Sequence, residues 1–332
     1  MSLESIVEIN LQFLTFIIFA IFVSFFIAWF ERKIVARMQN RVGPKLSQPI
    51  FDFLKLSAKE DIYSSKEGKF VLKYTPISQL AIILTILFFI PIIGSSSFIH
   101  FEGDLLLYIT LFALSSALIF IIASVSKSPY TLIGGNRSII TEVSLEIPLI
   151  ISFASLAVFS GSLEISTISS RYLAKITSIS SVQEVLYFGI FLILFLVIIF
   201  SYLGVLELNP FSTAKAETEI VGGWKTELTG KNLAIIELAE HLRVFIIASF
   251  LASIFLGNSF AGYVFSFEVM NIVLFFGFLL LTILKILFIV FLLMFFHNVT
   301  ARSRINTIAD NFWFLLVLSS LLLLGVVILE VI

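Results

Sequence analysis

The chain has 332 residues, of which 59% are hydrophobic and only 13% are charged. A soluble globular chain is typically about one quarter charged, so the composition excludes a soluble enzyme, a disordered chain and a nucleic-acid-binding protein. The formal net charge is −1, and the sequence contains no cysteine. The chain therefore has no thiolate ligands for zinc or an iron-sulfur cluster. Any redox chemistry would use a cofactor held mostly by another chain.

Eight long apolar stretches indicate membrane-spanning helices. A helix needs about 20 mostly apolar residues to cross a bilayer, and these runs are continuous, without the alternation that a strand would show. The predicted spans are 11–30, 78–99, 105–126, 142–163, 185–206, 233–257, 269–296 and 311–330. We therefore expect an all-α, polytopic membrane protein in which residues 1–332 form a single membrane domain.

Basic residues are distributed unevenly among the loops between these spans. The odd-numbered loops carry 17 Lys and Arg residues, whereas the even-numbered loops carry only Arg171 and Lys175. Loops rich in Lys and Arg stay in the cytoplasm. We therefore expect the odd-numbered loops inside the cell and both termini outside, which an even number of spans allows.

Two of the cytoplasmic loops have a distinctive composition. The docking loop, residues 31–77, holds ten of the basic residues, and its segment 48–60 has the pattern of an amphipathic helix, which fits a helix lying on lipid or on a docked protein. The acidic loop, residues 207–232, mixes carboxylates with apolar side chains such as Trp224, as expected for a segment packed against protein. The Ser-rich outside loop 161–184 is expected to be irregular.

Acidic residues stand at the entries of two spans. Glu142 and Glu146 are one helical turn apart at the start of the fourth span, so both lie on one helix face. Glu237, Glu240 and His241 form a similar group at the start of the sixth. Each acid alone also fits the N-terminal turn of a helix.

Lys285 lies in the middle of the seventh span, where we expect it to pair with one of these acids. An ionisable group at membrane depth is costly unless it faces protein or water. Acids on two spans together with a buried lysine are typical of a proton relay.

Four short motifs follow one another in chain order. The first lies within residues 31–60 and includes Ala-Arg-Met-Gln at 36–39, Arg-Val-Gly-Pro at 41–44 and Gln-Pro at 48–49. The others are Arg137 with Thr-Glu-Val-Ser-Leu at 141–145, a segment from Asn-Pro-Phe at 209–211 to Ala-Glu at 239–240, and Arg302 with Arg304. Together they resemble the membrane subunit of respiratory complex I that joins the peripheral redox arm to the membrane arm.

The resemblance implies a role for each matching residue. Contact with the peripheral arm or a quinone cavity is implied for Arg32, Arg37, Gln39, Arg41, Asp52, Lys55, Arg302 and Arg304. The predicted proton relay comprises Glu142, Glu217, Glu219, Glu227 and Glu240 from the resemblance, and Glu146, Glu237, His241 and Lys285 from their local pattern. No residue of this chain is predicted to be catalytic itself or to bind a metal.

The chain departs from the family pattern at several positions. Only residues 45–47 separate the Gly-Pro from the Gln-Pro motif, where complex I subunits have a longer insert. Ser212, Lys215 and Asn306 stand where the family has a carboxylate. These differences favour the branch of energy-converting nickel-iron hydrogenases and sulfane reductases. Glu146 and Glu237 would then act as local substitutes in the proton path.

The resemblance implies a membrane subunit of an ion-translocating oxidoreductase, without a complete active site of its own. Such a subunit would anchor the redox arm and relay protonation changes to ion pumping. Two alternatives stay open: the quinone-binding subunit of an NADH or ferredoxin:quinone oxidoreductase, and a stand-alone proton or sodium transporter. A purely structural anchor is a further alternative. The basic docking loop favours a platform for partners over a transporter.

The implied partners are peripheral iron-sulfur and hydrogenase-like redox subunits, antiporter-like membrane subunits and the lipid bilayer, with no nucleic acid. Iron-sulfur clusters and, in the hydrogenase branch, a nickel-iron centre would lie in partner subunits. This chain would bind no cofactor alone, although the quinone alternative implies a bound quinone. We expect a multi-pass protein of a prokaryotic inner or plasma membrane.

Overall fold

The computed structural model describes residues 3–63, 68–92, 97–177, 182–257 and 269–331, and in these ranges it contains helices and loops. The long helices are α1 (Leu3–Met38), α3 (Lys69–Leu87), α4 (Asp104–Val125), α5 (Pro129–Ser160), α7 (Val182–Val205), α9 (Gly230–Phe255), α10 (Val269–Val299) and α11 (Ile305–Val331). The short ones are α2 (Gln48–Ser57), α6 (Ile165–Thr177), α8 (Glu217–Ile220) and the 3-10 helix η1 (Gly223–Lys225). In the described ranges, eight helices are long and apolar enough to cross a membrane. The predicted all-α fold with eight spans is confirmed.

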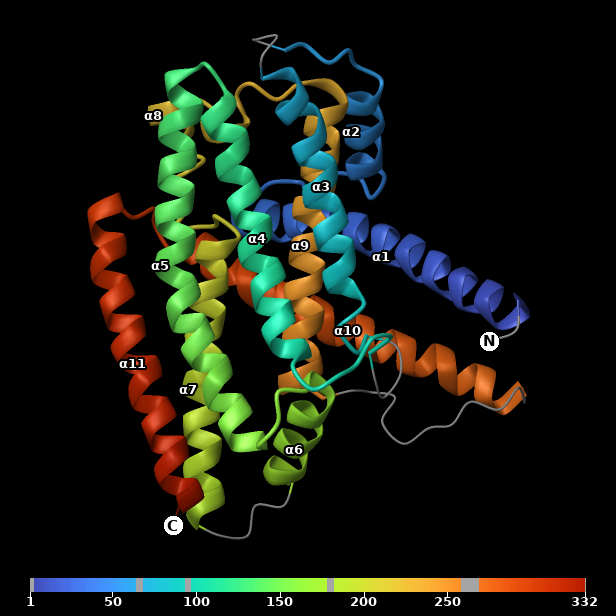
Figure 1. Cartoon of the computed structure of the whole chain (residues 1–332), viewed down its shortest axis with the longest axis vertical. Coiled ribbons are helices and arrows are strands. Elements are labelled where there is room, and N and C mark those ends of the chain that lie inside the picture. The colour runs from blue at the N-terminus through green and yellow to red at the C-terminus, as the bar shows by residue number, and fades with distance from the viewer. Residues whose placement is uncertain (1–2, 64–67, 93–96, 178–181, 258–268, 332) are drawn as a thin grey trace.

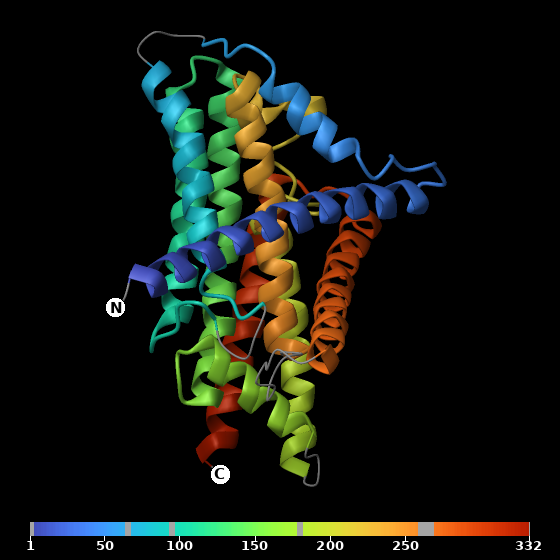
Figure 2. The ribbon, with the colours of Figure 1, turned by 90° about the vertical axis from the view of Figure 1, so that its right-hand side faces the viewer.

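Two of the long helices cross the others at a steep angle. Helices α3, α4, α5, α7, α9 and α11 run roughly along the long axis of the molecule, whereas α1 and α10 are strongly inclined to it (Figure 1). A view from the side shows α1 passing across the bundle (Figure 2). It packs against α9 and α10, and α2 packs against α1 and α9. The docking loop is therefore held against the centre of the bundle.

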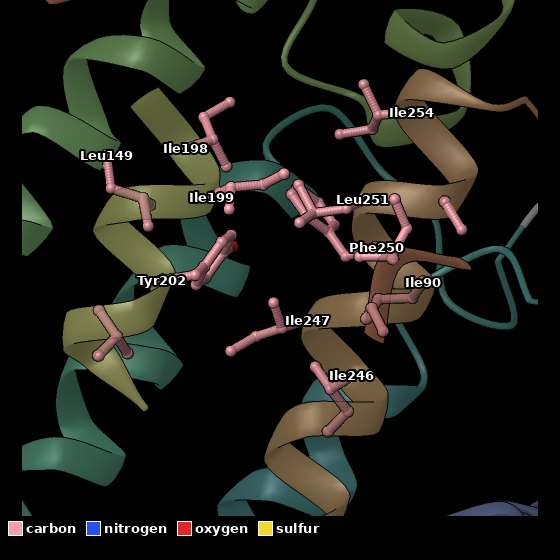
Figure 3. Packing of buried hydrophobic residues seen from close by; sticks show 14 of the residues in the cluster. Ile90, Leu149, Ile198, Ile199, Tyr202, Ile246, Ile247, Phe250, Leu251 and Ile254 are labelled. Carbon is pink, nitrogen blue, oxygen red and sulfur yellow. The ribbon is translucent and has the colours of Figure 1, made fainter. Parts of the chain in front are cut away.

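The centre of the bundle is apolar and aromatic along the part of α9 that follows its last charged residue, Arg243. Tyr202 on α7 and Phe250 on α9 are among the side chains that fill the space between these helices (Figure 3). Tyr108 on α4 stacks on Phe250 with ring centroids 4.2 Å apart, and its hydroxyl lies 2.8 Å from that of Tyr202. Aromatic contacts of this kind add to the free energy gained from burial. They fix the relative positions of α4, α7 and α9.

Several helices extend beyond the predicted spans. Helix α1 continues to Met38 and α3 begins at Lys69, so both ends of the predicted loop 31–77 are helical. Helix α5 begins at Pro129, well before the predicted start at residue 142. Charged residues end the membrane-crossing part of a helix, but they do not break the helix itself. The amphipathic helix is present as α2, which ends three residues before the predicted boundary at residue 60.

The loop predicted at residues 161–184 is not wholly irregular, which corrects the expectation from its serine content. Residues Ile165–Thr177 form α6, whose buried Ile165, Ile168 and Tyr172 lie on one face. The side chain of Asp104 on α4 accepts a hydrogen bond from the backbone N–H of Ile165 at 2.9 Å. This bond satisfies one of the free N–H groups at the start of α6.

Candidate functional site

Helix α9 carries the central charged groups of the molecule. It is the most buried of the eight membrane-length helices, with 89% of its most apolar segment buried. Glu240 and Arg243 lie one turn apart in its N-terminal half. Because α9 packs against α1, α3 and α10, its charged side chains face protein rather than lipid. This is the situation in which a charge is tolerated at membrane depth.

Glu240 lies between two lysines from the loop that follows α7. Its Oε1 accepts a hydrogen bond from Nζ of Lys215 at 3.1 Å, and its Oε2 accepts one from Nζ of Lys225 at 2.6 Å. Lys215 also lies 3.0 Å from Oε2 of Glu207. The four side chains form a chain of alternating charge, Lys225–Glu240–Lys215–Glu207, in which each acid has at least one basic neighbour.

Glu207 is not among the residues predicted for the relay, and its backbone explains why it points inward. Its φ is 54°, in the left-handed region that non-glycine residues rarely adopt. The N–H of Glu207 bonds to the carbonyl of Gly204 at 2.9 Å, and the N–H of Leu208 bonds to that of Leu203 at 2.8 Å. These two bonds close α7 in the Schellman pattern. A helix end of this kind usually carries glycine, so the sequence gives no signal for it here.

The carboxylate of Glu207 is almost completely enclosed. Its side chain is 3% exposed, and Ser138 on α5 donates a hydrogen bond to it at 2.5 Å. The indole N–H of Trp224 lies 3.1 Å from both carboxylate oxygens. Burial alone would raise the pKa of Glu207, but the Lys215 ammonium and the Ser138 hydrogen bond outweigh this effect and hold the pKa below its usual value.

Two glycines permit close packing of segment 206–229, one within the segment itself and one on α5, against which the segment lies. Gly223 has a φ of 61°, and a methyl group there would overlap the carbonyl oxygen of Ala214. A methyl group at Gly134 on α5 would lie 2.6 Å from the backbone nitrogen of Trp224. Glycine is the residue that permits both the backbone angle and the close approach. Trp224 itself is fully buried, so the expectation that this loop packs against protein is confirmed.

Glu142 on α5 is paired with Arg243 from the opposite side of this cluster. The closest atoms, Oε1 and Nη1, are 3.5 Å apart, and both side chains are almost fully buried. Nη2 of Arg243 donates hydrogen bonds to Ser115 at 2.7 Å and Ser116 at 2.9 Å. Oε2 of Glu142 and Oε1 of Glu146, one turn further along α5, have no hydrogen-bond partner among the described residues. Glu142 is therefore buried and Glu146 is half-buried, and each has one unpaired oxygen.

Two cavities connect this cluster to the C-terminal half of α1. The smaller, of about 140 Å³, is lined by Leu206, Leu208, Val244 and Met294 together with Glu31, Glu207, Lys215, Glu240, His241 and Arg243. We call it the charged chamber. The larger, of about 440 Å³, opens at the surface of the protein and shares Glu31, Leu208 and Met294 with the chamber. One carboxylate oxygen of Glu31 is buried without a hydrogen-bond partner in the described part of the chain.

Two of the residues predicted to contact a peripheral arm line the larger cavity. Arg32 and Arg41 line it, and Arg41 donates a hydrogen bond to Gln39. Arg32 forms an ion pair with Asp52 on α2 at 2.6 Å, to which Gln48 donates at 2.9 Å. Burial would raise the pKa of Asp52, but the hydrogen bonds and the charge of Arg32 lower it below its usual value.

His297 on α10 was not predicted to belong to the site, yet it also lines the larger cavity. Its Nδ1 accepts a hydrogen bond from the backbone N–H of Asn209 at 2.9 Å. A lone histidine at the end of an apolar span gives no sequence signal of such a contact.

A second group of charges lies on the surface beside the chamber. Glu219 accepts hydrogen bonds from Arg137 at 2.5 Å and from Arg302 at 2.9 Å, and its side chain is 50% exposed. These contacts hold the pKa of Glu219 below its usual value. The pairs join α5, α8 and the segment before α11. At this exposure solvent screens both pairs, so they add little to stability.

The remaining predicted residues are not gathered in the chamber, with the exception of His241. Exposed on the surface are Arg37, Lys55, Glu217 and Arg304, whereas Glu227 and Glu237 are partly exposed. Lys285 does not form the expected ion pair with an acid in the described ranges; its ammonium donates to the carbonyl of Gly257 at 3.0 Å. That carbonyl lies just beyond the C-terminus of α9, where a cation is favoured. The described residues contain no group of three or more side chains placed to hold a metal ion.

In the described ranges, eight helices long and apolar enough to cross a membrane surround a chamber lined by charged side chains, which is the architecture of a multi-pass membrane protein. Residues 11–328 match the family described as NADH dehydrogenase, and the chain belongs to this family. It is 31% identical over 235 residues to the H-type subunit of NADH-quinone oxidoreductase from Bacillus cytotoxicus, covering 69% of this chain and 68% of that protein. The corresponding protein of Bacillus cereus is 29% identical over 293 residues, which cover 85% and 82% of the two chains.

A solved structure has the same fold. The chain superposes with a TM-score of 0.80 on a chain of the membrane-bound sulfane sulfur reductase, an archaeal respiratory membrane complex. The identity is 24%, and the match covers 96% of this chain and 99% of the other. The predicted family is confirmed: the chain is a multi-pass membrane subunit of a complex-I-related oxidoreductase.

Proposed function

We propose that this subunit anchors the peripheral redox arm and converts its redox changes into protonation changes that drive ion movement in the membrane. The observation that carries the proposal is the position of the charged chamber. It adjoins the cavity that Arg32 and Arg41 line, beside the loop proposed to dock the arm. A redox event at that cavity would act on Glu31 first.

The protonation step falls to the carboxylates with unpaired oxygens. Glu31 lines both cavities, and Glu142 reaches the chamber through Arg243. A proton on either of them changes the charge that Arg243 and Glu240 experience, because Coulomb forces are strong in a low-dielectric site. Glu146 continues the path along α5. Coupling of this kind requires contiguous groups with two arrangements.

The docking surface consists of exposed basic side chains around the cavity mouth and on α2. Arg37, Arg41 and Lys55 are exposed, and Arg32 holds α2 in place through Asp52. We propose that this surface faces the cytoplasm and that both termini lie outside. Because the chain has no cysteine, single cysteines can be labelled selectively. Lys59→Cys should resist an impermeant thiol reagent added outside intact cells, and Glu102→Cys should react; the reverse pattern contradicts the orientation.

The large cavity favours a second candidate, the binding of a quinone headgroup. It combines the apolar walls of Val35 and Val42 with the polar groups of Glu31, Arg41 and His297, as small-molecule sites do. Val35→Phe would narrow it without a new charge. If quinone is the acceptor, this variant should lose quinone reduction but keep electron transfer to a soluble dye. Equal loss or equal retention of both activities argues against a quinone in this cavity.

The experiment that tests the proposed function uses the whole complex in sealed vesicles, energised with reduced methyl viologen, with ions moved per electron as the readout. Glu142→Gln keeps the shape of the side chain but removes its exchangeable proton, so the ratio should fall on the order of tenfold while the complex stays assembled. Glu217→Gln is the matched control, because Glu217 is exposed and its loss should leave the ratio unchanged. An unchanged ratio for Glu142→Gln would show that Glu142 is structural.

A further inference from the structure

Lys215 is the only basic side chain among the described residues that bridges two acids of the charged chamber. Its ammonium lies 3.0 Å from Glu207 and 3.1 Å from Glu240. The two acids come from different elements, the end of α7 and the middle of α9. Lys225 touches only Glu240 of these two acids and is not part of the chamber lining. Lys215 therefore links two elements that carry the same charge.

The positive charge of the Lys215 ammonium is balanced by the carboxylates of Glu207 and Glu240. Burial would lower its pKa, but Glu240 and Glu207 together raise it above its usual value. It therefore stays charged throughout the physiological pH range. The other titratable groups that face the chamber are Glu31 on α1 and His241 with Arg243 on α9. A permanently charged group between two acids keeps both acids ionised.

We propose that Lys215 is a positioning residue, a tethered ammonium ion that holds Glu207 and Glu240 as a fixed, ionised bridge and so leaves proton exchange to Glu31 and Glu142. The inference rests on the proposed function. It assigns different roles to acidic residues that the sequence alone does not distinguish. Glu207 and Glu240 hold the chamber together electrostatically. Glu31 and Glu142, whose oxygens are partly unpaired, take up and release the proton.

The chamber offers a direct test, because a small amine can replace a tethered one. Lys215→Ala removes the ammonium and leaves space in a cavity of about 140 Å³, which borders the larger open cavity. In sealed vesicles of the whole complex, driven by reduced methyl viologen, the ions moved per electron should fall on the order of tenfold. Added ethylamine should restore the ratio, because its ammonium can donate to both acids. Tetramethylammonium has the charge but no N–H donor and should not restore it.

Lys225→Ala is the matched control. It also removes a cation from Glu240, but the vacated position does not line the chamber, so ethylamine should have no effect on this variant. If the Lys215→Ala complex does not assemble, Lys215→Arg and Lys215→Gln replace it, since both keep a long side chain and only arginine keeps the charge. Arginine should preserve the ratio and glutamine should lose it.

The outcomes separate the two proposals. If the wild-type complex moves no ions, the proposed function fails, and this inference fails with it. If the wild type pumps but assembled Lys215→Ala keeps the full ratio, or loses it without rescue by ethylamine, only the role of Lys215 is overturned. In the substitute pair, equal ratios for arginine and glutamine overturn that role in the same way.

Discussion

The two halves of the bundle differ in the side chains that they enclose: one encloses charged groups and the other apolar groups. The half that contains the charged chamber holds a partly buried chain of acids and bases, Lys225–Glu240–Lys215–Glu207, beside the buried pair of Glu142 with Arg243. The other half is filled by aromatic and aliphatic side chains between α7 and α9 (Figure 3), where Tyr108 of α4 contacts Phe250 and Tyr202. Beyond Arg243, α9 continues with Val-Phe-Ile-Ile-Ala-Ser-Phe-Leu at residues 244–251.

This contrast indicates where a charge can travel within the chain. Buried charge is tolerated where partners surround it, and burying it without them is costly. Among the described residues the chain of ion pairs ends at the level of Arg243, and beyond it α9 presents mainly apolar side chains, with Ser249 and Ser253 as its buried polar ones. Such an arrangement fits a subunit that passes its signal sideways to a partner better than a stand-alone transporter, which would need a polar route through the whole membrane.

Replacing Arg243, which lies at the boundary between the charged and the apolar half, should cause the largest loss of stability. Arg243→Met leaves Glu142 buried without a basic neighbour, which should cost about 3–5 kcal/mol. Thermal unfolding of the purified complex in detergent measures the loss. The double variant Arg243→Met/Glu142→Gln removes both charges and should recover much of the stability. A double variant as unstable as the single one would mean that packing, rather than charge, determines the effect.

The backbone at Gly223 should be the next most sensitive position. Alanine there would have a left-handed φ of 61° and would overlap the carbonyl of Ala214. The strain should cost about 1–3 kcal/mol and loosen segment 206–229, seen as faster cleavage of this segment by trypsin. Gly189→Ala is the control, since a methyl group there meets no atom within 4 Å. Equal cleavage rates for the two variants would argue against close packing of this segment.

The apolar half should respond with a change in stability but none in coupling. Tyr108→Phe keeps the stacking on Phe250 and removes the hydrogen bond to Tyr202, for a loss of about 1 kcal/mol. The ratio of ions moved per electron should stay at the wild-type value. A clear drop in that ratio would place Tyr108 in the conduction path and remove the difference between the two halves.

The smallest effect is expected at the pair of Arg32 with Asp52 on the rim. Asp52→Asn should cost about 0.5 kcal/mol, because both side chains are about one third exposed. The pKa of Asp52 is lower in the folded chain than its usual value, so its contribution is present at neutral pH and disappears as the pH falls through that lowered value. The stability difference between wild type and Asp52→Asn should therefore be constant from neutral pH to about pH 4. A difference that already vanishes at pH 6 contradicts the assignment.

The sequence predicts the fold well because membrane spans depend on composition alone. It also predicts burial of Glu142, which stands at the entry of an apolar helix, whereas the side chain of Glu240 is 23% exposed. It does not reveal their partners: Arg243 and Glu142 are 101 positions apart, and no local pattern connects them. Lys285 shows the same limit, because its partner is a backbone carbonyl, which has no signature in the sequence.

Two further features depend on backbone geometry. Glu207 stands in a loop between Leu206 and Leu208, and its left-handed φ accompanies the turn that brings the carboxylate toward Lys215. The Lys215 position differs from the family pattern, but its bridging role follows from the positions of Glu207 and Glu240, which both lie within ion-pair distance of its ammonium. Helix α6 is difficult to predict because it contains several serine and threonine residues, which have a low helix preference. Burial of one face of the helix overcomes this preference.

The most direct test of a protonation relay is the infrared difference spectrum between the oxidised and reduced complex. Reduction of the peripheral arm should change the carbonyl-stretch absorption of a protonated carboxyl group. This signal should be lost in Glu142→Gln and retained in Glu217→Gln, because Glu142 is buried and Glu217 is exposed. A carboxyl signal that persists unchanged in both Glu142→Gln and Glu31→Gln would contradict the account, since the redox-linked proton would then reside on another group.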